Sequence, residues 1–150
     1  MRSYMMFAIL AGVAWGVGGY FEKTGLQQMK IPPIAGITLR TVVALIILGA
    51  LSIPAWRSIV NYSDIRSWLM IIIGGGIIAG SIGMWSFYSA LSVSQNLGVT
   101  LAIAFAFSPI AGTAMNLIYG HQKLDLKISL GLLAIISGIV LIQLAHKPVK

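Results

Sequence analysis

Five long runs of apolar residues, separated by short polar segments, dominate the pattern of the chain. They cover residues 4–21, 34–53, 68–91, 97–119 and 126–145. Each run is close to the roughly 20 apolar residues that a helix needs to cross a hydrocarbon core of about 30 Å. The segments between them hold charges, Pro, Gly, Ser and Asn, which are typical of loops. The pattern predicts an all-α membrane protein with five transmembrane helices.

Composition agrees with a membrane location. Of the 150 residues, 58% are hydrophobic and 9% are charged, and the mean hydropathy is +0.94, whereas a soluble domain has roughly 25% charged residues. The net charge of +7 would suit nucleic acid if the basic residues formed one soluble face, but they lie between the apolar runs. Anionic lipid head groups account for charges in such positions. The chain has no Cys, which excludes disulfides and thiolate metal sites.

The first run follows Arg2 and is similar to the core of a secretory signal peptide. It lacks a convincing A-x-A cleavage site, and four further spans follow it, so we expect it to be retained. No segment between the runs is longer than a short loop. Residues 1–150 are therefore predicted to form a single transmembrane domain.

Arg40 lies inside the second run, where a charge is unfavourable. An Arg near a helix centre costs about 2.5–3.5 kcal/mol on insertion scales, and each Leu, Ile or Val returns roughly 0.3–0.6 kcal/mol. The run holds eleven such residues, so we expect it to insert. Arg40 is also only about 9 Å from the start of its helix, close enough for the side chain to extend to the membrane surface.

The basic residues are balanced across the membrane, because five spans put the two ends of the chain on opposite sides. Short loops that orient a membrane protein carry a clear excess of Lys and Arg on one side. Two alternatives stay open: insertion in both orientations, which lets opposite copies pair as inverted repeats do, or one orientation fixed by another signal. On the N-terminal side there are five basic residues: Arg2, Arg57, Arg66, Lys123 and Lys127. On the other side there are four, namely Lys23, Lys30, Lys147 and Lys150, or five if Arg40 is counted there.

Five segments carry a family resemblance over almost the whole chain. They read AGVAWGVGGYFEKTGL, GITLRTVVALIILG, MWSFYSALSVS, FSPIAGTAMNLIYG and SLGLLAIISGIVLI. In this order and spacing they resemble one five-helix EamA repeat of the drug/metabolite transporter superfamily. Typical members have two such repeats in inverted orientation, so the resemblance implies that this chain dimerises to complete ten helices. It also implies a multi-pass transporter of the plasma (inner) membrane.

The chain departs from the family pattern at two places. Many EamA repeats end the fourth helix with Gly-Glu and a basic residue, whereas His121 stands in the place of the acid here. Some single-repeat relatives carry charged residues just before the Ser-Pro of this helix, where Phe105 and Ala106 stand. Roles of those charges in coupling or gating are therefore not carried over.

Polar and aromatic residues gather on single faces of the predicted helices. Ser81, Trp85, Tyr88 and Ser92 recur at helical spacing in the third helix. Pro109 cannot donate to the carbonyl four residues earlier, so a kink is expected, and broken backbone in a membrane often lines a transport cavity. Alternatively, the aromatic residues belong to interfacial belts and the Pro to an ordinary span. The candidate cavity and substrate-binding residues are Trp15, Glu22, Arg40, Ser81, Trp85, Tyr88, Ser108 and Asn116.

Glu22 lies near the end of the first helix, on the same side of the membrane as Arg40. EamA repeats usually carry an arginine in helix two, and by the resemblance Arg40 occupies that place. Because Lys would snorkel equally well, a planar fork that holds a carboxylate or helix-end carbonyls is the better account. We expect a mainly structural pair, with attraction of an anionic substrate group as the alternative.

Small residues four positions apart predict close helix packing in three of the spans. The pairs are Gly12 and Gly16, Gly76 and Gly80, and Ala134 and Gly138.

The inventory of reactive groups predicts no enzyme, no metal site and no cofactor. His121, His146, Asp64 and Asp125 fall in loops or in the C-terminal tail, and no H-E-x-x-H, G-x-S-x-G or P-loop pattern occurs.

Two classes of function remain. The first is a transporter of a small polar or amphipathic, amino-acid-like metabolite, working by alternating access in a homodimer whose protomers are antiparallel. The second is a non-transporting membrane assembly subunit. A proton-coupled exporter of cations, like the small multidrug resistance proteins, needs a membrane carboxylate, and Glu22 is the sole candidate, so we rank it lower. The expected partners are a solute, the lipid bilayer and a second copy of the chain, and not nucleic acid.

Overall fold

The computed structural model describes residues 3–62, 64–120 and 125–145, whose regular structure is helical. Its helices long and apolar enough to span a membrane are Ser3–Met29, Pro33–Asn61, Ile65–Val93, Leu97–Tyr119 and Leu126–Ala145. The five predicted spans are confirmed, the last two with the predicted bounds. The chain forms two units, divided between Val93 and Ser94, and each is described by itself. His121 and His146 lie outside the described residues.

Helix α1, Ser3–Met29, is longer than the sequence pattern predicts. Its last turns include Leu26, which falls in a predicted loop, and Glu22, which was predicted to lie near the end of the helix. The prediction of a loop is wrong because good helix formers continue past the apolar run, interrupted only by the weaker Thr24 and Gly25. The helix ends where Lys30 takes a left-handed backbone, with φ of 51°, just before two prolines.

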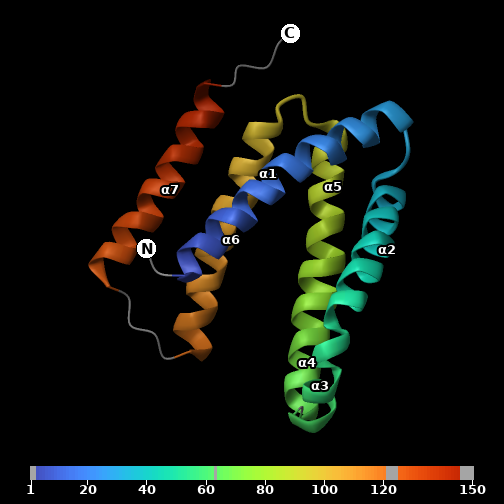
Figure 1. Ribbon diagram of the computed structural model, residues 1–150. Coiled ribbons are helices and arrows are strands. Elements are labelled where there is room, and N and C mark those ends of the chain that lie inside the picture. Colours follow the sequence, from blue (N-terminus) through green and yellow to red (C-terminus); the bar gives the residue numbers. More distant parts are fainter. Residues whose placement is uncertain (1–2, 63, 121–124, 146–150) are drawn as a thin grey trace. The chain divides into compact units, whose positions relative to one another are not determined.

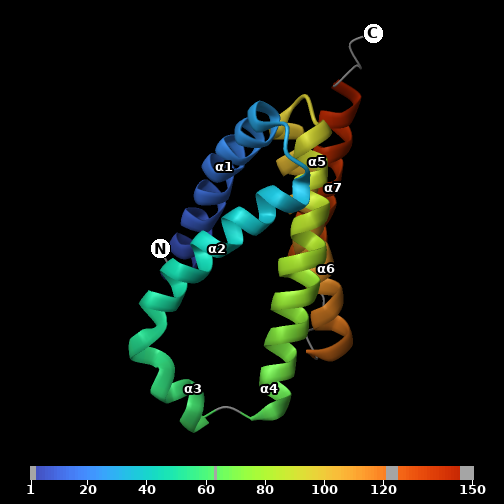
Figure 2. The same cartoon turned by 90° about the vertical axis from the view of Figure 1, so that its right-hand side faces the viewer.

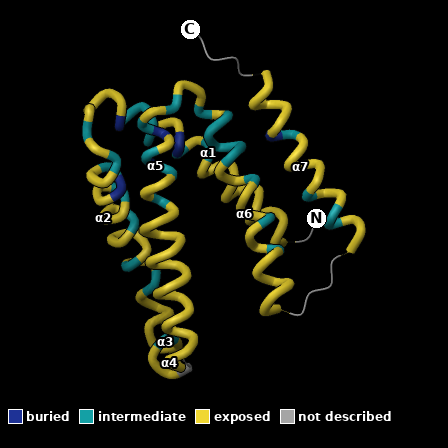
Figure 3. Tube along the Cα trace, turned by 180° about the vertical axis from the view of Figure 1, so that it is seen from behind, coloured by how far each residue is buried: buried dark blue, intermediate teal, exposed yellow. Residues whose placement is uncertain are grey.

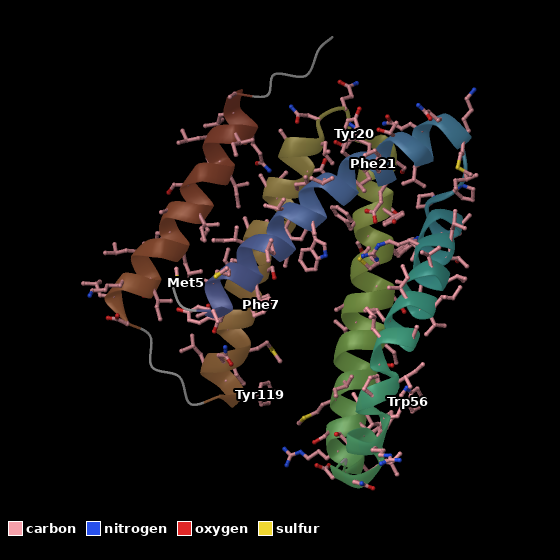
Figure 4. The ribbon with its side chains drawn as sticks, viewed as in Figure 1. Met5, Phe7, Tyr20, Phe21, Trp56 and Tyr119 are labelled. Carbon is pink, nitrogen blue, oxygen red and sulfur yellow. The ribbon has the colours of Figure 1, made fainter. Side chains whose placement is uncertain are left out.

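Helix α2, Pro33–Ser52, begins with Pro at its first position, where the missing N–H needs no partner. The segment after it is also helical instead of forming the predicted loop, as the 3₁₀ turn η1, Ile53–Ala55, and helix α3, Trp56–Tyr62. Pro54 is compatible with this because it stands in the first turn of η1. The exposed Trp56 marks the start of α3 (Figure 4).

The third span consists of helix α4, Ile65–Met70, the π-helix η2, Ile71–Gly83, and helix α5, Met84–Val93. Eleven of the thirteen residues of η2 are Ile or Gly, which are weaker α-helix formers than Ala or Leu. The Ser81 hydroxyl donates to the Gly76 carbonyl at 2.9 Å, five residues back, and a Cβ on Gly80 would lie 2.8 Å from the Gly75 oxygen. The wide turns therefore depend on glycine at position 80.

In the first unit, α5 is the helix on which α1 and α2 both pack. Figure 1 shows α1 crossing the upper part of α5, while Figure 2 shows α2 near α5 at its start and diverging from it towards α3. The buried side chains of this unit are Leu26, Ile37, Tyr88 and Leu91. Figure 3 shows the buried positions of this unit gathered at the end where α1, the start of α2 and α5 meet. The core of the unit is thus small and one-sided.

The second unit is a pair of helices in contact, α6, Leu97–Tyr119, and α7, Leu126–Ala145. The side chain of Asn96 caps α6 by accepting from the Val99 N–H at 3.3 Å. Helix α6 continues through Pro109 as one element, and a kink there stays a prediction. Ile139 of α7 is the buried hydrophobic residue of the described part of this unit.

Among the described residues of each unit, the predicted close packing of small residues is not found. A Cβ on Gly12, Gly16, Gly76 or Gly138 would meet no atom of its own unit within 4 Å. The close approach lies instead at Gly36 of α2, where a Cβ would be 2.7 Å from Leu26 Cδ2 and 3.2 Å from the Tyr88 ring. Small residues permit close packing, but a neighbouring helix must also be present.

Candidate functional site

Glu22 of α1 and Arg40 of α2 form an ion pair. The Arg40 Nε lies 2.9 Å from the Glu22 Oε1, and the side chains are 38% and 22% exposed, respectively. The expected pairing is confirmed. It requires α1 to remain helical beyond residue 21, because the added turn carries Glu22 towards the start of α2.

Tyr88 of α5 is the third member of this group. Its phenol hydrogen-bonds the Glu22 carboxylate, and its side chain is 2% exposed. An ionised carboxylate can only accept, so the Tyr88 hydroxyl donates. Glu22, Arg40 and Tyr88, which we call the Glu22 cluster, thus connect three helices through one carboxylate.

Each residue of the Glu22 cluster has an apolar residue or a glycine one helical turn away on the same helix, and the packing of these neighbours holds the cluster in place. Leu26 follows Glu22 by four residues, Gly36 precedes Arg40 by four, and Leu91 follows Tyr88 by three, so each lies on the same face as its polar neighbour. Leu26 and Leu91 are buried. The Tyr88 ring and Leu26 both lie against the backbone of Gly36, which leaves the ring little room to move.

The predicted stripe on the third span is divided between buried and exposed positions. Tyr88 is buried, whereas Trp85 is 54% exposed, and Ser81 is exposed within η2 and bonded to its own helix. A regular α-helical spacing does not extend to Ser81, because the π-helix ends only at Gly83. Trp15 of α1 is 53% exposed. The cavity-lining role of these residues stays a prediction.

Ser108 and Asn116 are exposed residues of α6, in the second unit. Pro109 lies between them and is also exposed. Their convergence with residues of the first unit on one cavity stays a prediction.

Two contributors to the cluster were missed by reasoning from the sequence. Leu26 was assigned to a loop, and Gly36 was not distinguished from other glycines. A signal was present for Gly36, since it lies one turn before Arg40 on the same face of a span. A glycine beside a membrane charge allows another helix to approach that charge closely.

Electrostatically, the Glu22 cluster is neutral, because one guanidinium offsets one carboxylate. Glu22 is also the only acidic residue within the five spans, since Asp64 and Asp125 lie between them. Its carboxylate accepts hydrogen bonds from both Arg40 and Tyr88. The arrangement can orient a guanidinium and join helices.

Comparison with known proteins identifies a family. The model of the EamA-like transporter family matches residues 2–144, a range that extends over most of both units and reaches all five spans. Neither the curated proteins nor the solved structures contain a match. The match and the spans agree with a multi-pass protein of the plasma membrane and with one EamA-type repeat. The chain belongs to the EamA-like transporter family and is a membrane transporter of the drug/metabolite transporter superfamily.

Proposed function

We propose that the protein moves a small neutral, zwitterionic or anionic metabolite across the membrane by alternating access. The observation that carries this choice is the state of Glu22, the only acid within the spans, which is held by Arg40 and Tyr88. A proton-driven exporter of cations needs a carboxylate that can exchange a proton for its substrate. A cation at Glu22 would have to compete with a guanidinium 2.9 Å away.

The proposed functional unit is a homodimer with ten helices, formed by two copies in opposite orientation. Two features support it: the balanced basic residues, and a family in which two inverted repeats form the transport fold. A Cβ added at Gly12 or Gly16 would meet no described atom of the same unit within 4 Å. The face of α1 that carries these two glycines is therefore available for another helix.

Labelling of single cysteines tests the orientation, because the chain has no Cys of its own. Ser3→Cys and Pro148→Cys are made separately and labelled with an impermeant maleimide in intact and in permeabilised cells. Opposite orientations predict partial labelling of each variant in intact cells. Labelling of each variant from one side only contradicts the proposal.

The transported solute is identified by a binding screen of purified protein over amino acids and related metabolites, followed by flux into liposomes. Trp85→Ala should reduce flux more than folded yield, because Trp85 is 54% exposed and not part of the core. Equal losses would assign Trp85 to packing. Absence of flux for every solute bound would favour the assembly subunit.

Proton coupling is tested in the same liposomes with Glu22→Gln. The proposal predicts that transport of the solute moves no protons with it, either in the native protein or in this variant. Proton movement that disappears with Glu22 would favour the cation exporter.

A further inference from the structure

The Arg40 guanidinium carries more N–H donors than its single contact from Nε to the Glu22 Oε1 occupies. A guanidinium carries five N–H donors in a planar fork, and the atom that contacts Glu22 is Nε. The two terminal nitrogens lie at the other end of this fork, on a side chain that is 38% exposed. Inside a membrane span such donors need an acceptor, because an unsatisfied cation is unfavourable there.

The direction of these donors is fixed by the rest of the Glu22 cluster. The Glu22 carboxylate holds Nε and is itself held by Tyr88. Tyr88 is 2% exposed and packs on the backbone of Gly36. The Arg40 side chain is therefore held in one orientation by residues of three helices. Less side-chain entropy is then lost when its terminal nitrogens bind a ligand.

We propose that the terminal nitrogens of Arg40 form a binding site for an oxyanion, a carboxylate or phosphate group, with Glu22 and Tyr88 as positioning residues. Two parallel N–H···O bonds fit the geometry of either group. For a carried solute, this inference rests on the proposed transport function and narrows the substrate class to molecules with a carboxylate or phosphate.

A lipid head group could supply the same chemistry. Arg40 is the eighth residue of α2, about 10 Å from its start, a depth from which a guanidinium reaches the phosphates of the bilayer. The two sources share the same interaction with Arg40, and the experiment separates them.

The charge of Glu22 gives the proposal a directional test. Glu22 positions Arg40, but its negative charge also repels an oxyanion that arrives at the guanidinium. At such short range repulsion outweighs the loss of positioning, so Glu22→Gln should tighten anion binding by about tenfold, after allowance for the partial exposure of both groups. A purely structural role of Glu22 predicts weaker binding instead.

Delipidated protein in a neutral detergent is titrated with inorganic phosphate and with acetate, and binding is measured from thermal stability. In a second arm, native mass spectrometry counts phosphatidylglycerol retained by each variant. The variants are Arg40→Gln, Arg40→Lys and Glu22→Gln. Arg57→Gln is the matched control, since Arg57 is an exposed arginine of α3.

Loss of anion binding in Arg40→Gln, partial retention in Arg40→Lys, tighter binding in Glu22→Gln and no change in Arg57→Gln support the site. Protection by phosphate or acetate assigns it to a soluble ligand, and retention of phosphatidylglycerol alone assigns it to lipid. Binding that is equal in Arg40→Gln and Arg57→Gln, or weaker in Glu22→Gln, overturns the proposal. If anion binding follows the prediction but no bound solute crosses the liposome membrane, the transport proposal fails and the site remains.

Discussion

The two halves of the third span are stabilised in different ways. In α5, Tyr88 and Leu91 are buried against α1 and α2, and a carboxylate of α1 accepts from Tyr88. In η2, none of the thirteen described residues is buried, and the Ser81 hydroxyl bonds the backbone of its own helix. One continuous helix thus combines an end fixed by its neighbours with a glycine-rich segment held by local hydrogen bonds.

This difference shows what positions a helix in a membrane. Apolar side chains gain little by moving from lipid into protein, so helices associate through close packing and polar contacts. The α5 half of the third span has close packing at Gly36 and polar contacts at the Glu22 cluster. The η2 segment is rich in small residues, but no helix of its unit packs closely on Gly74, Gly75 or Gly76.

The largest expected effect is the loss of Tyr88. Tyr88→Ala should lower the free energy of unfolding by about 3 kcal/mol, because it leaves a cavity and removes a donor from Glu22. Trp85→Ala, three residues away and 54% exposed, should change it by no more than about 0.5 kcal/mol. Unfolding in detergent, followed by circular dichroism, measures both. Equal losses would remove the distinction between the buried and exposed faces of α5.

A smaller loss is expected at Gly36. Gly36→Ala should cost about 1 kcal/mol, because the crowding of its Cβ against Leu26 and the Tyr88 ring exceeds the gain in helix propensity. Gly49→Ala is the control in the same helix, since its Cβ would meet no atom of its unit within 4 Å, and it should be neutral or stabilising. The same unfolding assay applies, and a stabilising Gly36→Ala would contradict the close approach of the helices.

The π-helical geometry of η2 can be tested with little effect on stability. Gly80→Ala places a Cβ 2.8 Å from the Gly75 oxygen, so the segment should convert to α-helix, with a stability change within about 1 kcal/mol. Gly76→Ala, with open space around its Cβ, should leave the wide turns intact. Backbone carbon chemical shifts in micelles measure the conversion, and identical shifts for the two variants would contradict the role of Gly80.

The smallest effect is expected from pH at the start of α4. The pKa of Asp64 is lowered because its carboxylate accepts from the Ser67 N–H at 2.9 Å and the Ser67 hydroxyl at 2.8 Å. The stabilisation is therefore present above the ordinary pKa of 3.8 and is lost as the pH falls through the lowered value. Thermal midpoints measured below about pH 4 should decrease more in the native protein than in Asp64→Asn. Parallel decreases would show that the cap contributes nothing.

Sequence reasoning predicted those parts of the fold that depend on local pattern. Hydrophobic runs gave five spans, and alternation of spans across the membrane gave the pair of Glu22 with Arg40. It failed where a neighbouring helix decides the outcome. Tyr88 was assigned to a polar and aromatic stripe of candidate cavity residues together with Ser81 and Trp85, whereas α1 and α2 bury Tyr88 and leave the other two exposed. The length of α1 was missed because polarity ends an apolar run without ending a helix, and a helix breaker comes only at Pro32.

The claim that Arg40 holds the only acid within the spans underlies both the structural account and the low ranking of cation export. A double-mutant cycle on Glu22→Gln and Arg40→Lys, measured as thermal stability in detergent, tests it most directly. We predict a coupling of about 1 kcal/mol, so that the second substitution costs little once the first is made. Losses that add to within about 0.3–0.5 kcal/mol would show that the two residues do not stabilise each other and would contradict the account.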